Sequence, residues 1–284
     1  MITCNLMGGL GNQIFQIFAT ISYAIKSRNQ FKFLNQTILG GGATTVRYTF
    51  WETFFSKLKP FLIQDLPQPM HILRENGFNY NELPISKMGN KNVMIYGYFQ
   101  SYKYFQENYD IIYKLLNIDK MKHELIDKLN LNSLYIDLEN TVSMHFRIGD
   151  YKNIQHFHPL ATYEYYEGSI KYFKSLHPNK KFNILYFCED CDIDDVLSVI
   201  NKLVEKFPMY NYTRGLNTLD DWQQMLLMSC CHHNIIANSS FSWWAAYLNS
   251  NKDKIVCYPS VWFGPSANND TKDLCPSDWT KIKF

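Results

Sequence analysis

Short runs of apolar residues alternate with helical periodicity along the second half of the sequence, and this alternation restricts the fold more than any other feature. An apolar run predicts a buried strand, and apolar residues spaced three or four apart predict a helix that covers it. Strands separated by helices form a parallel sheet with helices on both faces. Strands are expected at 141–146, 182–188, 234–237 and 255–258, the last closing the set, and helices at 162–176, 193–207, 219–231 and 241–248.

The first half shows the same pattern less regularly. A strand at 2–7, a tight turn at 8–11 and a helix at 13–26 open the chain, and a second strand is expected at 93–99. Further helices are expected at 102–116 and 121–129, whereas 35–92 predicts irregular structure with short helices. A chain of 284 residues is long enough to form two cores. We therefore expect an α/β protein with two domains, 1–140 and 141–284.

Composition excludes several classes of protein. Apolar residues make up 46% of the chain and charged residues 19%, which is typical of a compact globular protein. The net charge of +2, without a long basic run, argues against a general nucleic-acid binder. No apolar stretch reaches the roughly 20 residues of a membrane-spanning helix, and no secretory signal is evident. Seven cysteines without a regular framework suit a reducing compartment, so we expect a cytoplasmic protein.

The stretch HFRIGDY follows the strand at 141–146 and combines residue types that suit phosphate binding. Ligands of open parallel sheets bind at the carboxyl ends of the strands. Arg147 can donate two hydrogen bonds to phosphate oxygens, and Asp150 can pair with that arginine and hold the loop. His145 and Tyr151 complete the motif. Taken alone, the same residues also fit a solvated turn beside a structural histidine.

A second candidate site follows the strand at 234–237, where the sequence reads ANSSFSWW. Asn238, Ser239, Ser240 and Phe241 lie where a strand passes into a helix. Hydroxyls and backbone N–H groups at a helix N-terminus form an anion site. The alternative is a capping serine followed by packed tryptophans.

Two further stretches are weaker signals. The opening GGLGNQ contains Gly9, Gly11 and Asn12, but it lacks the glycine spacing of a dinucleotide-binding loop. FCED places Glu189 and Asp190 at the end of the strand at 182–188, where carboxylates bind a guanine or a ribose, or merely cap the next helix.

Together these motifs resemble the α-1,2-fucosyltransferases of glycosyltransferase family 11. The resemblance runs from the first strand to Trp279 and includes an H-x-R-x-G-D-Y motif with all five fixed positions present. Two departures are FCED, where the family tends to have FSDD, and Ala245, where glycine often follows the tryptophans. The matching segments are GGLGNQ, YGYFQSYKYF, HFRIGDY and LMSCCHHNIIANSSFSWWAAYL.

The resemblance implies a GT-B-type fold, in which two Rossmann-like domains face each other across a cleft. It implies an inverting enzyme that transfers L-fucose from GDP-β-L-fucose to a galactose hydroxyl of a glycan, without metal or further cofactor. Arg147 would stabilise the leaving diphosphate, Asp150 would hold Arg147, and Asn12 would bond the diphosphate or orient the acceptor. No residue is identified as a general base. The donor-binding residues implied are Gly9, Gly11, His145, Tyr151, Glu189, Asp190, Asn238, Ser239, Ser240 and Phe241.

The expected partners are the donor and a galactose-terminated oligosaccharide or lipid-linked glycan. We expect no nucleic acid, and a cytoplasmic enzyme with peripheral contact at the inner membrane surface. Acceptor choice is expected to reside in 35–92 and in loops such as 155–159.

Four other interpretations are open. Asp192 and Asp194 form a D-x-D that a metal-dependent transferase would use, although helix capping is the simpler role. Cys188 and Cys191, or the run at 230–233, could bind zinc, but converging ligands are required and structural thiols are favoured. A non-catalytic protein that binds carbohydrate or nucleotide sugar would share the fold. An NAD-dependent enzyme is disfavoured by the glycine spacing.

Overall fold

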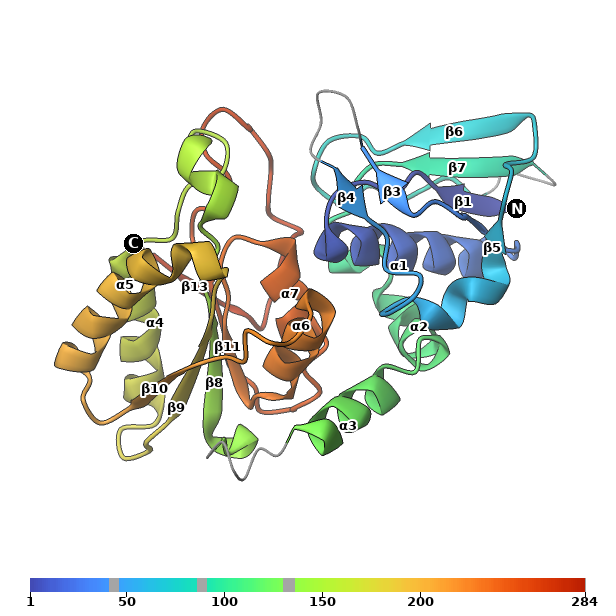
Figure 1. Cartoon of the computed structure of the whole chain (residues 1–284). Helices are drawn as coiled ribbons and strands as arrows, with labels where there is room; N and C mark the ends of the chain where they lie inside the picture. The colour runs from blue at the N-terminus through green and yellow to red at the C-terminus, as the bar shows by residue number, and fades with distance from the viewer. Residues whose placement is uncertain (41–45, 86–90, 130–135, 284) are drawn as a thin grey trace. The chain divides into compact units, whose positions relative to one another are not determined.

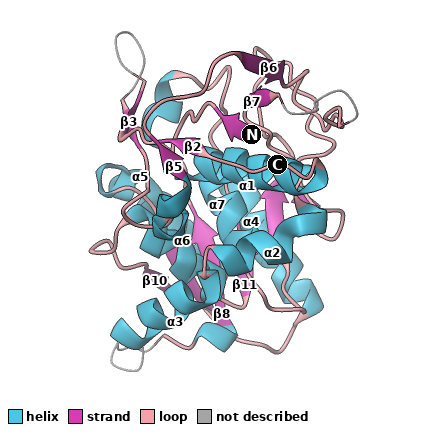
Figure 2. Cartoon of the chain, turned by 90° about the vertical axis from the view of Figure 1, so that its right-hand side faces the viewer, coloured by secondary structure: helices cyan, strands magenta, loops and turns pink. Residues whose placement is uncertain are grey.

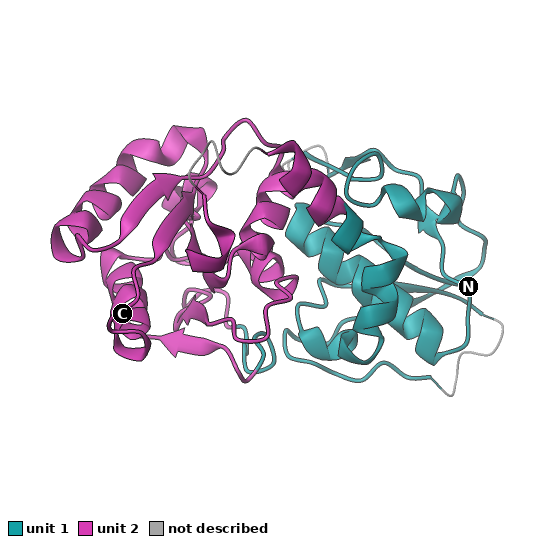
Figure 3. Ribbon diagram, turned by 90° about the horizontal axis from the view of Figure 1, so that it is seen from below, with its two compact units in different colours: residues 1–120, 269–276 teal, residues 121–268, 277–284 magenta. Residues whose placement is uncertain are grey.

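The chain forms two compact units in a computed structural model that describes residues 1–40, 46–85, 91–129 and 136–283. Unit 1 comprises Met1–Lys120 with Asn269–Pro276, and unit 2 comprises Met121–Asn268 with Ser277–Phe284 (Figure 3). The first division falls at Lys120, ahead of the boundary predicted after residue 140. The C-terminal part of the chain also returns to unit 1, which the sequence pattern did not indicate.

Unit 1 is built around a parallel sheet of three described strands in the order β1-β7-β6. Each strand of this sheet pairs in register with its neighbour over three to five residues. Figure 2 distinguishes these strands from the surrounding helices. The elements are β1 (Ile2–Cys4), α1 (Leu10–Lys26), β2 (Phe33–Leu34), β3 (Ile38–Leu39), β4 (Arg47–Tyr48), η1 (Ser56–Phe61), β5 (Leu62–Ile63), β6 (Met70–Arg74), β7 (Asn92–Tyr96), η2 (Tyr102–Tyr104), η3 (Gln106–Asn108) and α2 (Tyr109–Leu115).

Helix α1 is buried on nearly all sides, and its polar residues are hydrogen-bonded accordingly. Gln16 accepts from the N–H of Met7 (2.8 Å) and donates to the carbonyl of the same residue (2.9 Å). Gln13 donates to the carbonyls of Gly8 (3.0 Å) and Tyr48 (2.8 Å). The two glutamines therefore fix the loop that leads from β1 into the helix.

Unit 2 contains a parallel sheet of six described strands in the order β10-β9-β8-β11-β12-β13. In Figure 1, α4 and α5 lie on one side of this sheet and α6 and α7 on the other. Helix α3 (Ile118–Lys128) spans the division between the units. The remaining elements are η4 (Leu138–Asn140), β8 (Thr141–His145), η5 (Gly149–Asn153), α4 (Tyr163–Leu176), β9 (Asn183–Phe187), η6 (Asp190–Asp192), α5 (Ile193–Lys206), β10 (Asn211–Arg214), α6 (Asp221–Cys230), β11 (His233–Ile235), α7 (Ser240–Tyr247), β12 (Val256–Pro259) and β13 (Thr280–Ile282).

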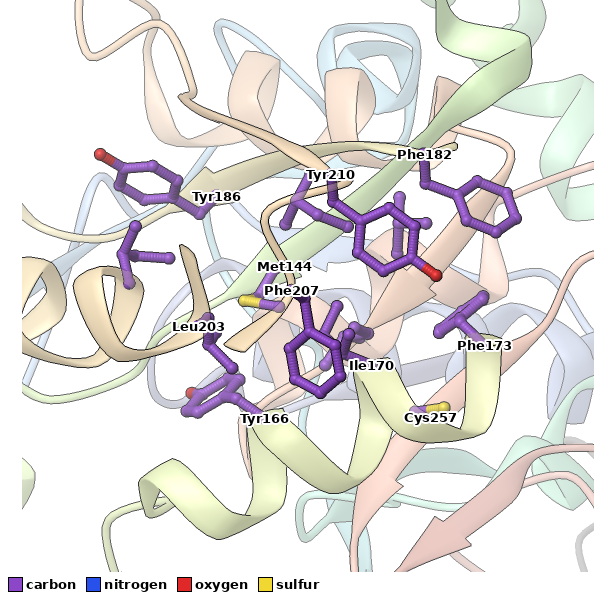
Figure 4. Close-up of a cluster of buried hydrophobic side chains, with 14 of the residues drawn as sticks. Met144, Tyr166, Ile170, Phe173, Phe182, Tyr186, Leu203, Phe207, Tyr210 and Cys257 are labelled. Atoms are coloured by element: carbon purple, nitrogen blue, oxygen red, sulfur yellow. The ribbon is translucent and has the colours of Figure 1, made fainter. Parts of the chain in front are cut away.

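An aromatic and aliphatic core joins α4 and α5 to this sheet (Figure 4). Phe146 stacks on Tyr166 with ring centroids 4.2 Å apart. The hydroxyl of Tyr165 donates to the carbonyl of Cys257 in β12 (2.9 Å), so this buried polar group is satisfied by the sheet. Such packing gives the carboxyl edge of the sheet a rigid support.

The α/β class with two units, each built on a parallel sheet, is confirmed. The GT-B-type arrangement of two Rossmann-like domains across a cleft remains a prediction. Several local predictions were wrong. The strand set does not close at 258, because β13 adds an edge strand, and β10 was not predicted. Among its described residues, the region 35–92 contains β3 to β6 as well as η1, and 102–116 is broken into η2, η3 and α2. Helix α1 begins at Leu10, so Gly11 lies inside the helix and not in the turn.

No helix in the described part of the chain has both the length and the apolar character that spanning a membrane requires. All seven cysteines are free thiols.

Candidate functional site in each unit

The two strongest sequence motifs of unit 2 flank one position in its sheet. Numbered within the unit, the strand order is 3-2-1-4-5-6, the order of dinucleotide-binding folds. The order reverses between β8 and β11, and the carboxyl edge at such a reversal is where these sheets bind ligands. His145 ends β8 and leads into Arg147, whereas Asn238 and Ser239 follow β11. The fold therefore brings together two motifs that are about ninety residues apart in the chain.

Arg147 is held from three sides. Its guanidinium forms ion pairs with Asp150 and with Oε1 of Glu189 (Nη1–Oε1 2.6 Å), and its Cζ lies 4.6 Å from the ring centroid of Tyr151. The carboxylates of Asp150 and Glu189 are 54% and 58% exposed, so these ion pairs are weak and exchangeable. An incoming phosphate can replace either carboxylate without a large loss of stability.

Gly149 makes this arrangement possible. Its φ of +36° lies in the region that favours glycine, and a Cβ there would lie 2.9 Å from Nη1 of Arg147. Its N–H donates to Oδ2 of Asp192 (2.7 Å), which anchors the loop to the start of α5.

His145 and Asn238 place unpartnered polar atoms at the same sheet edge. Both side chains are buried, and neither Nδ1 of His145 nor Oδ1 of Asn238 has a hydrogen-bond partner within the described structure. Burial, helped by the nearby charge of Arg147, lowers the pKa of His145 to about 3, so its imidazole is neutral. Buried polar atoms without partners are costly, which is the condition expected where a ligand supplies the missing bonds.

Asn238 also fixes the surrounding loops. Its Nδ2 donates to the carbonyls of Pro159 (2.8 Å) and Trp262 (3.1 Å). Ser239 caps α7 by accepting from the N–H of Phe241 (3.3 Å), and the ring of Phe241 lies 5.4 Å from that of His145. The serine hydroxyl is thus a helix cap in this structure, the simpler of the two roles that the sequence allowed.

Glu189 and Asp190 are adjacent in the sequence, but their carboxylates bind different partners. Glu189 binds Arg147, whereas Asp190 forms an ion pair with Arg214 and accepts from Nδ2 of Asn217 (3.2 Å). Arg214 ends β10 and was missed, because the sequence NYTR has no apolar run that predicts a strand.

Glu189, Cys191 and Asp192 bring three potential metal-ligand atoms within 4.8 Å of one another. Glu189 is engaged by Arg147, and Asp192, besides accepting from Gly149, lies 3.4 Å from Nζ of Lys152. Exposed Glu189 and buried Asp192 are thus already paired with cationic side chains, and the cluster gives no positive indication of a metal site. In the other run considered for zinc, Nδ1 of His233 accepts from the N–H of Ile255 (3.0 Å), which is a structural role.

Unit 1 places a different set of polar groups at the carboxyl edge of its own sheet. Gly8 has a φ of +75°, and a Cβ there would lie 2.4 Å from Nδ2 of Asn12. A Cβ on Gly9 would meet no described atom of the chain within 4 Å, whereas Gly11 is buried in the first turn of α1. Oδ1 of Asn12 accepts from Nε2 of Gln100 (2.8 Å), in the segment that follows β7.

Comparison with known proteins agrees with the motifs. The model of glycosyl transferase family 11 matches residues 43–283. The chain is 29% identical to an alpha-1,2-colitosyltransferase of Escherichia coli over 100% of this chain and 99% of the relative. It is 32% identical to the O-antigen biosynthesis glycosyltransferase WbnK of Escherichia coli over 66% of this chain and 60% of the relative. A galactoside 2-alpha-L-fucosyltransferase of Caenorhabditis elegans is 24% identical over 99% of this chain and 79% of the relative.

Solved structures of low sequence identity are also similar. A family 9 glycosyl transferase from Veillonella parvula gives a TM-score of 0.47 at 10% identity, over 100% of this chain and 85% of that one. A mutant of Arabidopsis thaliana FUT1 in complex with GDP gives 0.45 at 10% identity, over 90% of this chain and 69% of that one. The family model alone spans most of the sequence, and the chain therefore belongs to glycosyl transferase family 11 and is a glycosyltransferase.

Proposed function

We propose that the chain is an inverting α-1,2-fucosyltransferase that moves L-fucose from GDP-β-L-fucose to a galactose hydroxyl of a glycan without a metal ion. The observation that carries the proposal is the position of Arg147, at the strand-order reversal of unit 2 and between two exposed carboxylates that a diphosphate can replace. Family membership and the fucosyltransferase relative support the donor and the linkage.

Transfer breaks the bond between the anomeric carbon and the β-phosphate oxygen. Negative charge develops on the departing GDP, and positive charge develops on the sugar ring. A guanidinium that donates two hydrogen bonds stabilises that negative charge more in the transition state than in the ground state. Arg147 thereby fills the role that a divalent cation has in metal-dependent transferases, and Asp150 keeps it in place.

The remaining donor contacts follow from the same edge. Nδ1 of the neutral His145 and Oδ1 of Asn238 lack partners in the described structure and are available to hydrogen-bond the GDP-sugar. The N-terminus of α7 at Ser240 and Phe241 suits the diphosphate. Tyr151 supports the guanidinium face. Glu189 and Asp190, released from their ion pairs, would bind guanine or ribose. In unit 1 we propose that Asn12 binds the diphosphate or the acceptor, and that Gly9, which has no side chain, leaves room for this ligand beside the loop.

A second donor is favoured by one observation, since the colitosyltransferase relative matches the entire chain. Colitose is fucose without its 3-hydroxyl. A site that hydrogen-bonds this hydroxyl would reject colitose strongly, whereas a site without such a bond would accept both sugars. Comparing turnover of the two GDP-sugars on one acceptor separates these cases.

The deciding experiment is an assay with GDP-fucose and galactose-terminated acceptors, with and without EDTA. We expect turnover to survive EDTA and Arg147→Ala to lose at least about a hundredfold in kcat, which corresponds to about 3 kcal/mol in the barrier. Lys202→Ala removes an exposed positive charge from α5 of the same unit and serves as the control, with unchanged kcat. Full activity of Arg147→Ala, or abolition of wild-type turnover by EDTA, would overturn the proposal.

The acceptor and cellular location complete the proposal. A galactose-terminated oligosaccharide or lipid-linked glycan is the acceptor that we assign, reached in the cytoplasm with peripheral contact at the inner membrane surface. Sedimentation of the activity with membrane vesicles tests that contact, and activity confined to the supernatant would contradict it.

A further inference from the structure

Glu75 occupies an unusual place in unit 1. It follows β6 directly, at the carboxyl edge of the sheet. Oε2 accepts two backbone hydrogen bonds, from the N–H of Tyr98 (2.7 Å) and of Phe99 (3.0 Å). Oε1 is buried and has no hydrogen-bond partner in the described part of the chain. A carboxylate with one oxygen bound and the other unsatisfied is costly to bury.

The segment that Glu75 binds is a strained turn after β7. Phe99 is fully buried and has a φ of +52°, a conformation that bulky residues rarely adopt. Gly97 packs directly against the carboxylate, because a Cβ there would lie 2.5 Å from Oε2 of Glu75. The two hydrogen bonds to Glu75 therefore hold a backbone shape that the local sequence does not favour.

The turn determines where Gln100 lies, and Gln100 determines which end of the Asn12 amide is available. Nε2 of Gln100 donates to Oδ1 of Asn12 (2.8 Å). With its oxygen so engaged, the Asn12 side chain presents Nδ2, a hydrogen-bond donor, to a ligand. A phosphate oxygen or an acceptor hydroxyl oxygen needs such a donor.

We propose that Glu75 is a positioning residue that, by holding the turn at Tyr98 and Phe99, places Gln100 so that Asn12 presents its amide donor to substrate. The role of Asn12 rests on the proposed function. The series of contacts that leads from Glu75 through the turn and Gln100 to Asn12 does not depend on it.

The charge of Glu75 supports this role. Burial raises its pKa from 4.5 to about 7, opposed by the hydrogen bonds from Phe99 and Tyr98. Tyr104 on η2 senses this carboxylate: its pKa is raised to about 12, first by burial and then by the charges of Glu75, Tyr80 and Asp273. Arg74, the neighbour of Glu75 on β6, has its guanidinium over the ring of Tyr96, 4.5 Å from the centroid.

The raised pKa of Glu75 also makes the stability of the chain depend on pH. Between pH 4.5 and about 7 the folded chain binds more protons at Glu75 than the unfolded chain, so the contribution of Glu75 to stability falls as pH rises through this window. Glu75→Gln removes the charge of this half-buried carboxylate. We therefore expect the Tm of this variant to exceed that of wild type at pH 8, and the difference to vanish or reverse at pH 5.

The activity test uses three variants. Glu75→Leu removes the acceptor oxygens and is expected to lower kcat at least tenfold, with GDP affinity by calorimetry unchanged. Glu75→Gln keeps an acceptor and restores most of that loss. The ratio of wild-type to Glu75→Gln kcat is expected to be largest at pH 8 and to approach one at pH 6, where wild-type Glu75 is largely protonated. Glu82→Gln, an exposed glutamate of the same unit, is the control with wild-type kcat and pH profile.

A double-mutant cycle separates this proposal from the proposed function. If Glu75 acts through Gln100, the effects of Glu75→Leu and Gln100→Ala on the free energy of unfolding are non-additive, whether or not the protein transfers fucose. Additive effects, or wild-type kcat in Glu75→Leu, overturn the proposal. If Glu75→Leu does not fold, a pH-independent kcat ratio for Glu75→Gln overturns it.

Discussion

At the scale of single residues, Gly149 determines how closely Arg147 approaches Glu189. We expect Gly149→Ala to cost about 1–2 kcal/mol in unfolding free energy, because alanine is strained at a φ of +36°. It also displaces Nη1 of Arg147, which lies 2.9 Å from the new methyl group, so kcat falls more than tenfold. Urea unfolding and the transfer assay measure the two effects.

Gly9→Ala is the matched comparison for folding. Its φ is −78°, and among the residues that the structure describes a Cβ there would meet nothing within 4 Å. The unfolding free energy is expected to stay within about 0.5 kcal/mol of wild type. If the two substitutions destabilised the protein equally, the positive φ of Gly149 would not be the reason that glycine is needed there.

At the scale of elements, substitutions at two helix caps distinguish an effect on stability from an effect on ligand binding. Ser239 caps α7, and Asp220 caps α6 in a reciprocal arrangement with Gln223. Replacing either by alanine removes an N-cap and is expected to cost about 1 kcal/mol. Only Ser239→Ala is expected to weaken GDP binding, by about tenfold in calorimetry, because α7 begins at the proposed diphosphate site. A loss of GDP affinity in Asp220→Ala of the same size would contradict that assignment.

The elements that could be predicted from the sequence are those buried on both faces. β8 is buried along its whole length and β9 at every residue but its first, and both were identified closely. The missed strands β6, β10 and β13 all lie at sheet edges, where one flank is solvated and no continuous apolar run is needed. The helix predicted at 102–116 fails because Phe105 has a φ of −136° and packs fully buried in the core, which divides the segment.

The difference between central and edge strands also explains which site residues could be predicted from the sequence. Arg147 and Asn238 follow central strands, so their position at the carboxyl edge could be inferred from the sequence. Glu75 follows the edge strand β6 and Arg214 ends the edge strand β10; neither strand has an apolar signal, and nothing local indicated these residues. The contact of Gln100 with Asn12 joins residues 88 positions apart, which periodicity does not report.

At the scale of the whole molecule, the returning segment Asn269–Pro276 completes unit 1. Asp273 accepts from the N–H of Tyr80 (3.2 Å) and pairs with Lys103, and its carbonyl accepts from Oγ of Ser101 (2.6 Å). Asp273→Ala leaves the N–H of Tyr80 unsatisfied and is expected to cost about 1–2 kcal/mol in chemical denaturation. Asp270→Ala, which removes a surface pair with Lys272 in the same segment, is expected to change little.

The return of the chain to unit 1 also limits how this family's specificities can be recombined. Exchanging residues 1–120 between this chain and a relative by a single junction near Lys120 would leave each hybrid with a foreign 269–276 segment against its own Tyr80 and Ser101. A workable chimera needs three junctions, at 120/121, 268/269 and 276/277, so that the short segment travels with the half it completes. The two units are therefore interleaved along the chain and are not consecutive modules.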